Sequence, residues 1–532
     1  MSNHLPVLIV GAGPTGLTAA IGLQRYGIPF RIIDKQIKPV TTSNAIVIQS
    51  RTLEVWDDLG LLSQALQNGN PIREFTVFAN NKKIATVNLN LLEGVYQFSL
   101  GLAQSQTEQM MHTYLHAQRI PIETEVELSE LQEQKDSVLV TLRHKDGKTE
   151  TVTTDWLLAC DGGHSFVRDK LQLAFQGKEL TQHFIVADVY CSTLIAQQDL
   201  ELFLSEDGPL ILARYNKENM RIIAEVTGDA ELHAAKVVTD AQIKRILAAR
   251  CPIPLQIEKS LWTSGFWIHE RLITQYSRER IFFLGDAAHL HSPAGGQGMN
   301  TGIQDAYNLT WKLALVIQGY AARVLLDSYH EERHRVAKAL LRNTTVTTHM
   351  ITLKNKWLQK LRNFIMQLVM KSEKNRKKLT MLFSQLAVNY CYSTWVHDCC
   401  GHQPGPAAGM RMIDVVIDGQ RLFDKVRGRE FCLLVFSGQQ PELGLSERLA
   451  ELQSILCEKY LHVVRLILVT PDAGLAATWQ GDTWLDTNAI AHQRYHVVSS
   501  MFYLLRPDKY ISFRGELRHQ PELMQYFKKV FV

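Results

Sequence analysis

The sequence lacks several features that would assign it to a common class of protein. No apolar run approaches the roughly 18 residues of a membrane-spanning helix. The eight cysteines show no paired spacing, so the sequence indicates no disulfide framework. The net charge of +4 is small for 532 residues and indicates no polyanionic partner. These absences predict a cytoplasmic protein with reduced thiols, no integral membrane segment and no nucleic-acid partner.

Motifs for other kinds of chemistry are also missing. There is no phosphate-cradling Gly-x-x-x-x-Gly-Lys, no Ser-His-Asp constellation, no internal repeat and no low-complexity segment. His289 and His291 lie two residues apart, but no carboxylate or thiolate cluster completes a metal site. The apolar stretch Pro6–Val10 is too short for a signal-peptide core and has no basic leader. What remains is an ordinary globular composition, 46% hydrophobic and 21% charged, in a chain long enough for about three domains.

A glycine-rich pattern lies between two predicted strands at the start of the chain. An apolar strand at 5–10 leads directly into the candidate nucleotide-binding residues Gly11, Gly13, Pro14, Thr15 and Gly16. A helical stretch follows, and a second strand at 30–34 ends in Asp34, next to Lys35. In such a pattern the glycines serve a tight turn, the approach of a pyrophosphate and helix–strand packing, while the acid bonds a ribose hydroxyl. The pattern predicts a dinucleotide site and by itself fits FAD or NAD.

A second glycine-rich loop joins an apolar strand at 281–284 to a helix predicted at 305–314. Its candidate cofactor-binding residues are Gly285, Asp286, Pro293, Gly295, Gly298, Met299 and Asn300. The glycines let the backbone approach something flat and bulky, and a helix N-terminus offers unpaired N–H groups and partial positive charge. A reduced flavin carries negative charge over its pyrimidine end, so this loop favours FAD.

Together with a third segment, these loops resemble the motifs of FAD-dependent aromatic hydroxylases, the single-component flavoprotein monooxygenases. Residues 156–168 complete a strand and continue through Asp161 and Gly162 into a His-Ser-x-Val-Arg pattern. In the family this loop faces both the FAD diphosphate and the incoming nicotinamide cofactor, whereas Asp-Gly alone would indicate only a turn. The resemblance also places Arg51 beside the diphosphate and Gln104 against the flavin, although either could be an ordinary surface residue.

The resemblance implies an FAD-dependent monooxygenase of the phenol and polyketide hydroxylase type. Such an enzyme uses NADPH or NADH, as a transient co-substrate, and dioxygen to hydroxylate an aromatic or polycyclic phenol through a C4a-hydroperoxyflavin. Two alternatives stay open: a flavoprotein that binds FAD and a ligand without turnover, and another flavin oxidoreductase on the same scaffold. The sequence identifies neither the substrate nor a catalytic base. The polar and aromatic candidates on the substrate sheet, most of them expected to be structural, are His183, Arg214, Tyr215, Trp262 and His269.

The expected fold is α/β, with three parts. A Rossmann-like FAD-binding domain with a helical extension would take 1–75, 100–175 and 270–395. An inserted, mostly antiparallel substrate sheet would take 76–99 and 176–269. A glycine- and proline-rich stretch at 399–409 is expected to be a linker. The resemblance implies that 405–532 form a thioredoxin-like domain, which lacks Cys-x-x-Cys and would serve structure or a homodimer interface.

Residues 354–378 form a conspicuously basic segment with interleaved apolar residues. One interpretation is a helix that binds a membrane surface or an anionic partner. The other is an amphipathic helix whose apolar side packs on the flavin domain and whose basic side is solvated. The second is the expectation from sequence.

Overall fold

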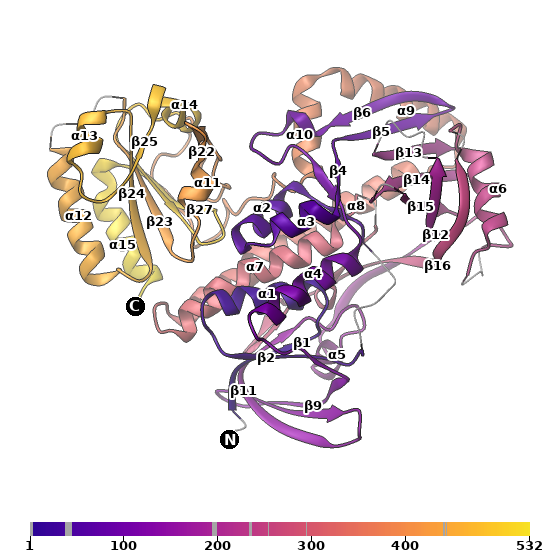
Figure 1. The fold of residues 1–532 in the computed structure, drawn as a ribbon, viewed down its shortest axis with the longest axis horizontal. Helices are drawn as coiled ribbons and strands as arrows, with labels where there is room; N and C mark the ends of the chain where they lie inside the picture. The colour runs from indigo at the N-terminus through magenta and orange to yellow at the C-terminus, as the bar shows by residue number, and fades with distance from the viewer. Residues whose placement is uncertain are drawn as a thin grey trace.

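The computed structural model describes residues 4–37, 45–193, 199–216, 218–232, 237–253, 255–293, 295–439, 442 and 444–532. Three large sheets organise these residues, and each sheet draws its strands from distant parts of the chain (Figure 1). Ala294, inside the second glycine-rich loop, lies outside the described residues. The α/β class expected from the sequence is confirmed.

The first sheet carries the three motifs. Its main path runs β17-β18-β11-β1-β2-β8, with β10 and β9 attached to β11. The bounds are β1 His4–Val10, β2 Phe30–Asp34, β8 Glu123–Thr124, β9 Val126–Glu133, β10 Val138–His144, β11 Thr149–Ala159, β17 Ser277–Arg278 and β18 Ile281–Phe283. Because β1 pairs in parallel with β2 and β11, and β11 with β18, the carboxyl ends of four strands lie at one edge.

Helices pack against this sheet and against one another. They are α1 Pro14–Arg25, α2 Ser50–Leu59, α3 Leu62–Asn68, α4 Gln104–Ala117, α5 Phe166–Lys170, α7 Gly298–Ile317 and α8 Asp327–Ile351. The helix α7 is buried along most of its length and crosses α1 closely (Figure 1). At the crossing, a Cβ on Gly22 would lie 2.5 Å from the Thr310 hydroxyl oxygen, so glycine allows the two helices to meet.

The second sheet is mostly antiparallel and is ordered β19-β16-β12-β15-β14-β13-β5-β6. Its strands are β5 Glu74–Ala79, β6 Lys82–Asn88, β12 Phe175–Thr193, β13 Leu200–Ser205, β14 Gly208–Arg214, β15 Asn219–Glu225, β16 Gln256–Ile273 and β19 His289–Leu290. The helix α6, Asp240–Arg250, packs against β13 and β16. Since β19 belongs to the second glycine-rich loop, that loop is hydrogen-bonded directly to this sheet.

Two further helices, α9 Lys356–Lys371 and α10 Glu373–Phe383, pack on β6 of the second sheet. The basic segment is therefore two helices, separated at Ser372. The expectation that its apolar side packs on the flavin domain is wrong. The helix α9 turns Arg362 and Met370 inward, and side chains such as Trp357 and Phe364 face solvent.

The C-terminal part contains a six-stranded sheet ordered β20-β27-β26-β23-β24-β25. Its elements are β20 His397–Asp398, β23 Phe431–Phe436, α12 Leu445–Lys459, β24 Val464–Thr470, α13 Ala473–Thr478, β25 Asp482–Leu485, α14 Ile490–Tyr495, β26 Met501–Leu505, β27 Ile511–Glu516 and α15 Gln520–Val530. The thioredoxin-like character of this part stays a prediction. Residues 399–409 are no free linker, because Gly409 donates its N–H to Ile511 and accepts from Tyr390.

Buried ion pairs join the C-terminal part to the first domain. Arg506 lies 2.5 Å from Glu332 of α8, and Glu332 also accepts from Lys312 of α7 at 2.8 Å. All three side chains are at most 3% exposed. Such a network leaves a costly unpaired charge if one member is removed, so the two parts are fixed together. Within the described ranges, every helix is too short or too polar to span a lipid bilayer.

Candidate functional site

The three predicted motif loops meet at the carboxyl edge of the first sheet. The register places Val10 beside Ala159, and Ala159 beside Phe283, at the ends of β1, β11 and β18. Backbone hydrogen bonds continue beyond the strands, from Cys160 N–H to Val10 and from Leu284 N–H to Ala159. The sequence positions of the loops are far apart, but parallel pairing brings them together.

The glycines of the first loop divide into two kinds. A Cβ on Gly11 would lie 2.3 Å from the carbonyl oxygen of Cys160, and one on Gly16 would lie 1.9 Å from that of Gly11. Both positions are therefore required by packing inside the protein. A Cβ on Gly13, in contrast, would meet no described atom within 4 Å. The bare backbone of Gly13 faces open space, which fits the close approach of a diphosphate.

The first turn of α1 has uncapped backbone N–H groups that can bind an anion. Gly13 precedes the helix, Pro14 takes its first position, and no side chain of the described residues caps it. The N–H groups of Thr15 and Gly16 therefore stay available, with the positive end of the helix dipole behind them. Nearby, the Asp34 carboxylate accepts from the N–H of Ala12 at 2.7 Å, which orients it at the end of β2. Lys35 is exposed beside it.

The second loop packs directly on the first. A Cβ on Gly285 would lie 2.6 Å from the hydroxyl oxygen of Thr15, and one on Gly302 would lie 2.3 Å from the same atom. These close approaches place Asp286 next to the start of α1. Solvent reaches the Asp286 side chain, yet desolvation by the surrounding protein raises its pKa, and the charge of His289 opposes that shift.

A buried carboxylate holds the second loop in place. Asp305 of α7 accepts from the N–H of Gly285 at 3.1 Å, from His289 Nε2 at 2.8 Å and from Arg333 Nε at 2.7 Å. Burial opposes ionisation of Asp305, but Arg333 and His289 outweigh it and lower the pKa. His289 thus has a structural partner. The described residues contain no group of three or more side chains suited to a metal ion.

The side chain of Asn300, in the first turn of α7, is committed to the protein. It donates to the carbonyl oxygens of Val47 and Gly296, both at 2.8 Å, and accepts from the N–H of Gln49 at 2.8 Å. Its side chain therefore positions α7 and leaves only the backbone N–H to face a cofactor. In the part of the chain that the structure describes, the N-terminus of α7 also lacks a side-chain cap.

Four other predicted residues of this loop lie around the same helix start. Gly295 adopts φ 89°, a conformation that favours glycine, and Pro293 accepts a backbone hydrogen bond from Gly296. Gly298 and Met299 open α7 and are both partly exposed. The loop thus presents backbone and one flexible side chain to the space beside α7, as a flat cofactor requires.

His291 is a site residue that sequence reasoning considered only as a metal ligand. Its Nδ1 donates to the carbonyl oxygen of Ser292 at 2.7 Å, and its Nε2 is buried without a partner in the described structure. That nitrogen lies 3.2 Å from the Cβ position of Gly298, at the N-terminus of α7. Burial and the charge of His289 lower the pKa of His291 to about 4, so the ring is neutral at physiological pH.

Gln104 opens α4 beside this region. Its Nε2 donates to Glu108 at 2.9 Å, and its Oε1 accepts from the N–H of Ala45 at 3.3 Å. The segment that begins at Ala45 continues to Val47, which contacts both Asn300 and Gly296. The structure therefore links Gln104, through the segment from Ala45 to Val47, to the loop that precedes α7, and its contact with the flavin stays a prediction.

Asp161 and Gly162 form the third loop. Asp161 Oδ2 accepts from the N–H of Val167 at 3.2 Å, whereas Oδ1 is buried and has no partner among the described residues. Burial raises the pKa of Asp161, and hydrogen bonds from Ser165 and Val167 oppose the shift. A buried acceptor without a partner calls for an explanation, and a bound group with a donor supplies one.

Arg51, predicted beside the diphosphate, has several partners within the protein. Its guanidinium pairs with Glu54 at 2.8 Å, donates to the carbonyl oxygen of Asp508 at 2.8 Å and lies 5.0 Å above the Tyr510 ring. Arg51 and Gln304 of α7 line the same small cavity. Gln304 lies on the side of α7 opposite Gly302, and it is Gly302 that faces Thr15 of the first loop. Arg51 therefore binds the C-terminal part, and a contact with the diphosphate stays a prediction.

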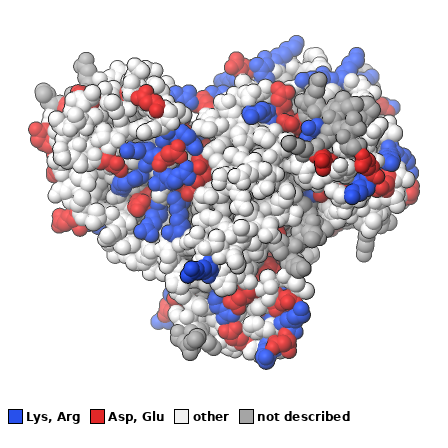
Figure 2. Space-filling view, in the orientation of Figure 1, with Lys and Arg blue, Asp and Glu red and all other residues white. Residues whose placement is uncertain are grey.

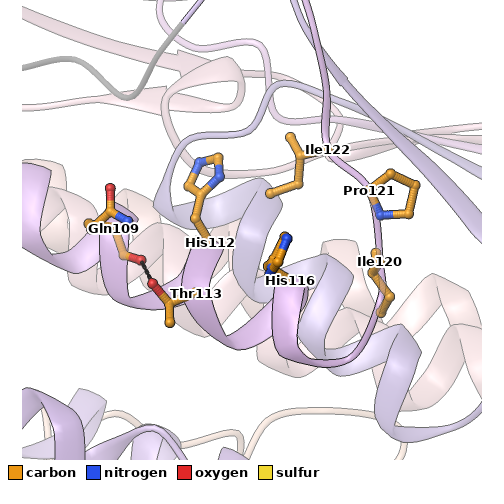
Figure 3. Close-up of a pocket in the computed structure, with 7 residues that line it drawn as sticks. All are labelled: Gln109, His112, Thr113, His116, Ile120, Pro121 and Ile122. Carbon is orange, nitrogen blue, oxygen red and sulfur yellow. Dashed lines mark hydrogen bonds between the residues drawn. The ribbon is translucent and has the colours of Figure 1, made fainter.

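A separate open cavity of about 530 Å³ lies along α4 (Figure 3). His112 and His116 project from α4 toward Ile122 in the segment that leads to β8. Burial lowers the pKa of His112, and the charge of Asp34 opposes the shift. The cavity thus borders the end of β2 but contains none of the predicted cofactor residues.

The candidate substrate residues lie in different parts of the second sheet. Tyr215 is buried in a cluster with Val47 and Ala103, next to the second loop, and Arg214 precedes it. Trp262 lies beside Arg221, and His183 packs against Trp267 with ring centroids 4.7 Å apart and ring planes tilted by 43°. His269 is exposed. Only Arg214 and Tyr215 therefore lie near the predicted flavin position.

Comparisons with known proteins identify the family and the fold. A family model described as an FAD binding domain matches residues 4–344. The 6-methylpretetramide 4-monooxygenase of Streptomyces rimosus is 38% identical over 351 residues, which are 66% of this chain and 62% of that protein. The pentachlorophenol 4-monooxygenase of Sphingobium chlorophenolicum is 30% identical over 100% of this chain and 97% of its own length. The fold resembles that of the flavin-dependent monooxygenase PieE, solved with FAD and substrate, with a TM-score of 0.78, 19% identity and 99% of each chain covered.

Proposed function

The chain belongs to the FAD-binding-domain family, and on that premise we propose that it is an FAD-dependent aromatic hydroxylase. It would use NADPH or NADH and dioxygen to add a hydroxyl group to an aromatic or polycyclic phenol. The observation that carries the proposal is the meeting of the three loops, with Gly13 facing open space and an unpartnered oxygen on Asp161. Both relatives described above are named as monooxygenases.

The residues of the site fit FAD along its length. Gly13 and the first turn of α1 would hold the diphosphate, and Asp34 a ribose hydroxyl. The N-terminus of α7 would face the pyrimidine end of the flavin, where its partial positive charge stabilises the charge of the reduced ring. When bound, FAD accepts a hydride and supplies the activated oxygen for hydroxylation.

The protein's own contribution is positioning. Asp305 and Asn300 fix the loop and the first turn of α7, so the helix N-terminus needs no rearrangement during the reaction. Pairing of β19 with β16 joins the flavin loop to the second sheet, which we propose as the wall of the substrate site. Tyr215 and Arg214 would then lie where an aromatic substrate meets the flavin.

The experiment is NADPH consumption in air by purified, FAD-loaded protein, with and without a panel of phenols and polycyclic aromatics. Hydrogen peroxide and product mass are followed in parallel. Consumption stimulated by one compound, with a mass gain of one oxygen and little peroxide, supports the proposal and identifies the substrate class. Protein that binds FAD but oxidises neither NADPH nor NADH with any compound contradicts it and favours a flavoprotein without turnover. The cytoplasmic location and the homodimer stay predictions, testable by fractionation and light scattering.

A further inference from the structure

The helix α9 exposes an apolar surface that points away from the protein. We define this apolar face as Trp357, Leu358, Leu361, Phe364, Ile365, Leu368 and Val369. Trp357 is 81% exposed, and Phe364 is 63% exposed. Isolated apolar side chains on a surface are ordinary, but a contiguous stripe of seven on one helix marks a surface that contacts something else.

The opposite side of α9 already has its partner. Arg362 and Met370 are buried, and Met366 packs with Met370 into the apolar cluster that covers β5 and β6. Arg362 donates to the carbonyl oxygen of Met350 at 2.9 Å. At about 100° per residue, Met366 and Met370 lie across the helix from Leu361 and Leu368, and Arg362 lies at the edge of the buried side. The apolar face is therefore not a core face that a small rotation would bury.

Basic side chains border the apolar face on one side. Between 354 and 378 the chain has nine Lys and Arg residues and a single acid, Glu373. By the same helical spacing, Lys360 and Lys371 lie along one flank of the apolar face, and α10 adds further lysines. Of this group, Lys356 pairs with Glu206 at 2.8 Å and Lys377 pairs with Glu93. Figure 2 shows Lys and Arg along the upper edge of the molecule, where Figure 1 places α9 and α10.

We propose that the apolar face of α9 docks on an anionic lipid bilayer, with the bordering lysines against the lipid headgroups. A helix that lies in the interface needs one strongly apolar face, basic residues beside it and an aromatic anchor, and α9 has a basic flank as well as the other two. Trp357, near the helix end, suits the boundary between acyl chains and headgroups. The proposal concerns attachment to a surface and does not depend on the enzymatic activity.

A second copy of the chain is the competing occupant, and the charge argues against it. A two-fold contact through α9 would bring the same surface together from both protomers. Lys360 and Lys371 of each copy, with the lysines of α10 other than Lys377, would then lie near the same lysines of the other copy across an apolar contact. An anionic bilayer neutralises this charge, whereas a second copy doubles it.

The test is flotation of the full-length, FAD-loaded protein with phosphatidylcholine vesicles that contain or lack phosphatidylserine. We expect binding only to the anionic vesicles, weakening at high salt, with a blue shift of Trp357 fluorescence that Trp357→Phe removes. The triple variant Trp357→Ser, Phe364→Ser, Leu368→Ser and the charge variant Lys360→Glu, Lys371→Glu should each lower the partition coefficient about tenfold or more. The matched control is Leu461→Ser with Val498→Ser, which removes two exposed apolar side chains from the C-terminal part and should bind as the wild type.

Three results would overturn the proposal: no flotation of the wild type, equal flotation with neutral and anionic vesicles, or equal binding by the triple variant. A dimer in light scattering that the triple variant converts to a monomer, without vesicle binding by the wild type, would assign the apolar face to a second copy. Retained FAD and an unchanged circular dichroism spectrum show that each variant is folded, which is expected because the substituted side chains are exposed.

Discussion

Alanine at Gly13 and alanine at Gly16, both in the first loop, should have opposite effects on the stability of the FAD-free protein. Gly13 has φ −74° and ψ −179°, an ordinary extended conformation, and an added Cβ meets no described atom within 4 Å. Gly13→Ala should therefore leave the FAD-free protein as stable as the wild type, or more stable by about 0.4–1 kcal/mol through reduced unfolded-state entropy. The methyl group would instead occupy the space of the diphosphate, so FAD affinity should fall at least about tenfold, or about 1.4 kcal/mol.

Gly16→Ala tests the other role. Its Cβ would lie 1.9 Å from the carbonyl oxygen of Gly11, a backbone atom held in turn by the contact of Gly11 with Cys160. The loop must move to relieve this overlap, and overpacking of this kind costs about 1–3 kcal/mol. The FAD-free variant should therefore be less stable than the wild type by about that amount.

The assay is urea unfolding of FAD-stripped wild type and both variants, followed by circular dichroism, together with FAD titration followed by flavin fluorescence. The reasoning fails if Gly13→Ala binds FAD as the wild type does, because Gly13 would then not face the cofactor. It also fails if Gly16→Ala unfolds at the same urea concentration as the wild type.

Three other substitutions test the polar groups of the molecule. Arg51→Met should lower the free energy of unfolding by about 1–3 kcal/mol and leave FAD affinity unchanged, because Arg51 binds the C-terminal part. Weakened FAD binding by the variant would show that Arg51 contacts the diphosphate. His291→Asn should reduce the loss of stability that the wild type shows as the pH falls from 6.5 to about 4. In that range His291 binds a proton in the unfolded wild type but not in the folded protein, which lowers the free energy of unfolding by at most about 3 kcal/mol. Urea unfolding as a function of pH measures the difference. Asp305→Asn should cost about 3–5 kcal/mol in urea unfolding, because it leaves Arg333 buried without its carboxylate; wild-type stability would show that another group compensates.

The strands, loops and helices around the candidate site could be predicted from the sequence because the evidence for them is local. A glycine pattern between an apolar strand and a helix depends on neighbouring residues alone, and parallel pairing then brings such loops to one sheet edge. Asp161 follows β11 and reaches this edge for the same reason, whereas Gln104 comes near it through its hydrogen bonds to Ala45. The α/β class and the mostly antiparallel insertion followed from periodicity.

The sequence could not predict contacts that depend on distant partners. Arg51 pairs with the carbonyl oxygen of Asp508, 457 residues away, and no local pattern distinguishes that use from a diphosphate contact. Asn300 belongs to the predicted motif, but its side chain forms hydrogen bonds with the backbone of Val47 and Gln49. For α9, periodicity revealed an apolar stripe and a polar side without showing that Arg362 lies on the buried one.

The ion pair between Arg506 and Glu332 has a consequence for the order of protein synthesis. The two residues are 174 positions apart, so at roughly 5–20 residues per second Arg506 leaves the ribosome about 9–35 s after Glu332. During that interval the nascent first domain holds Glu332 and Lys312 without the arginine that completes their network. We therefore expect the emerging chain to depend on chaperones until Arg506, which follows β26, has emerged, and ribosome-bound chains that stop before Arg506 to be more sensitive to protease.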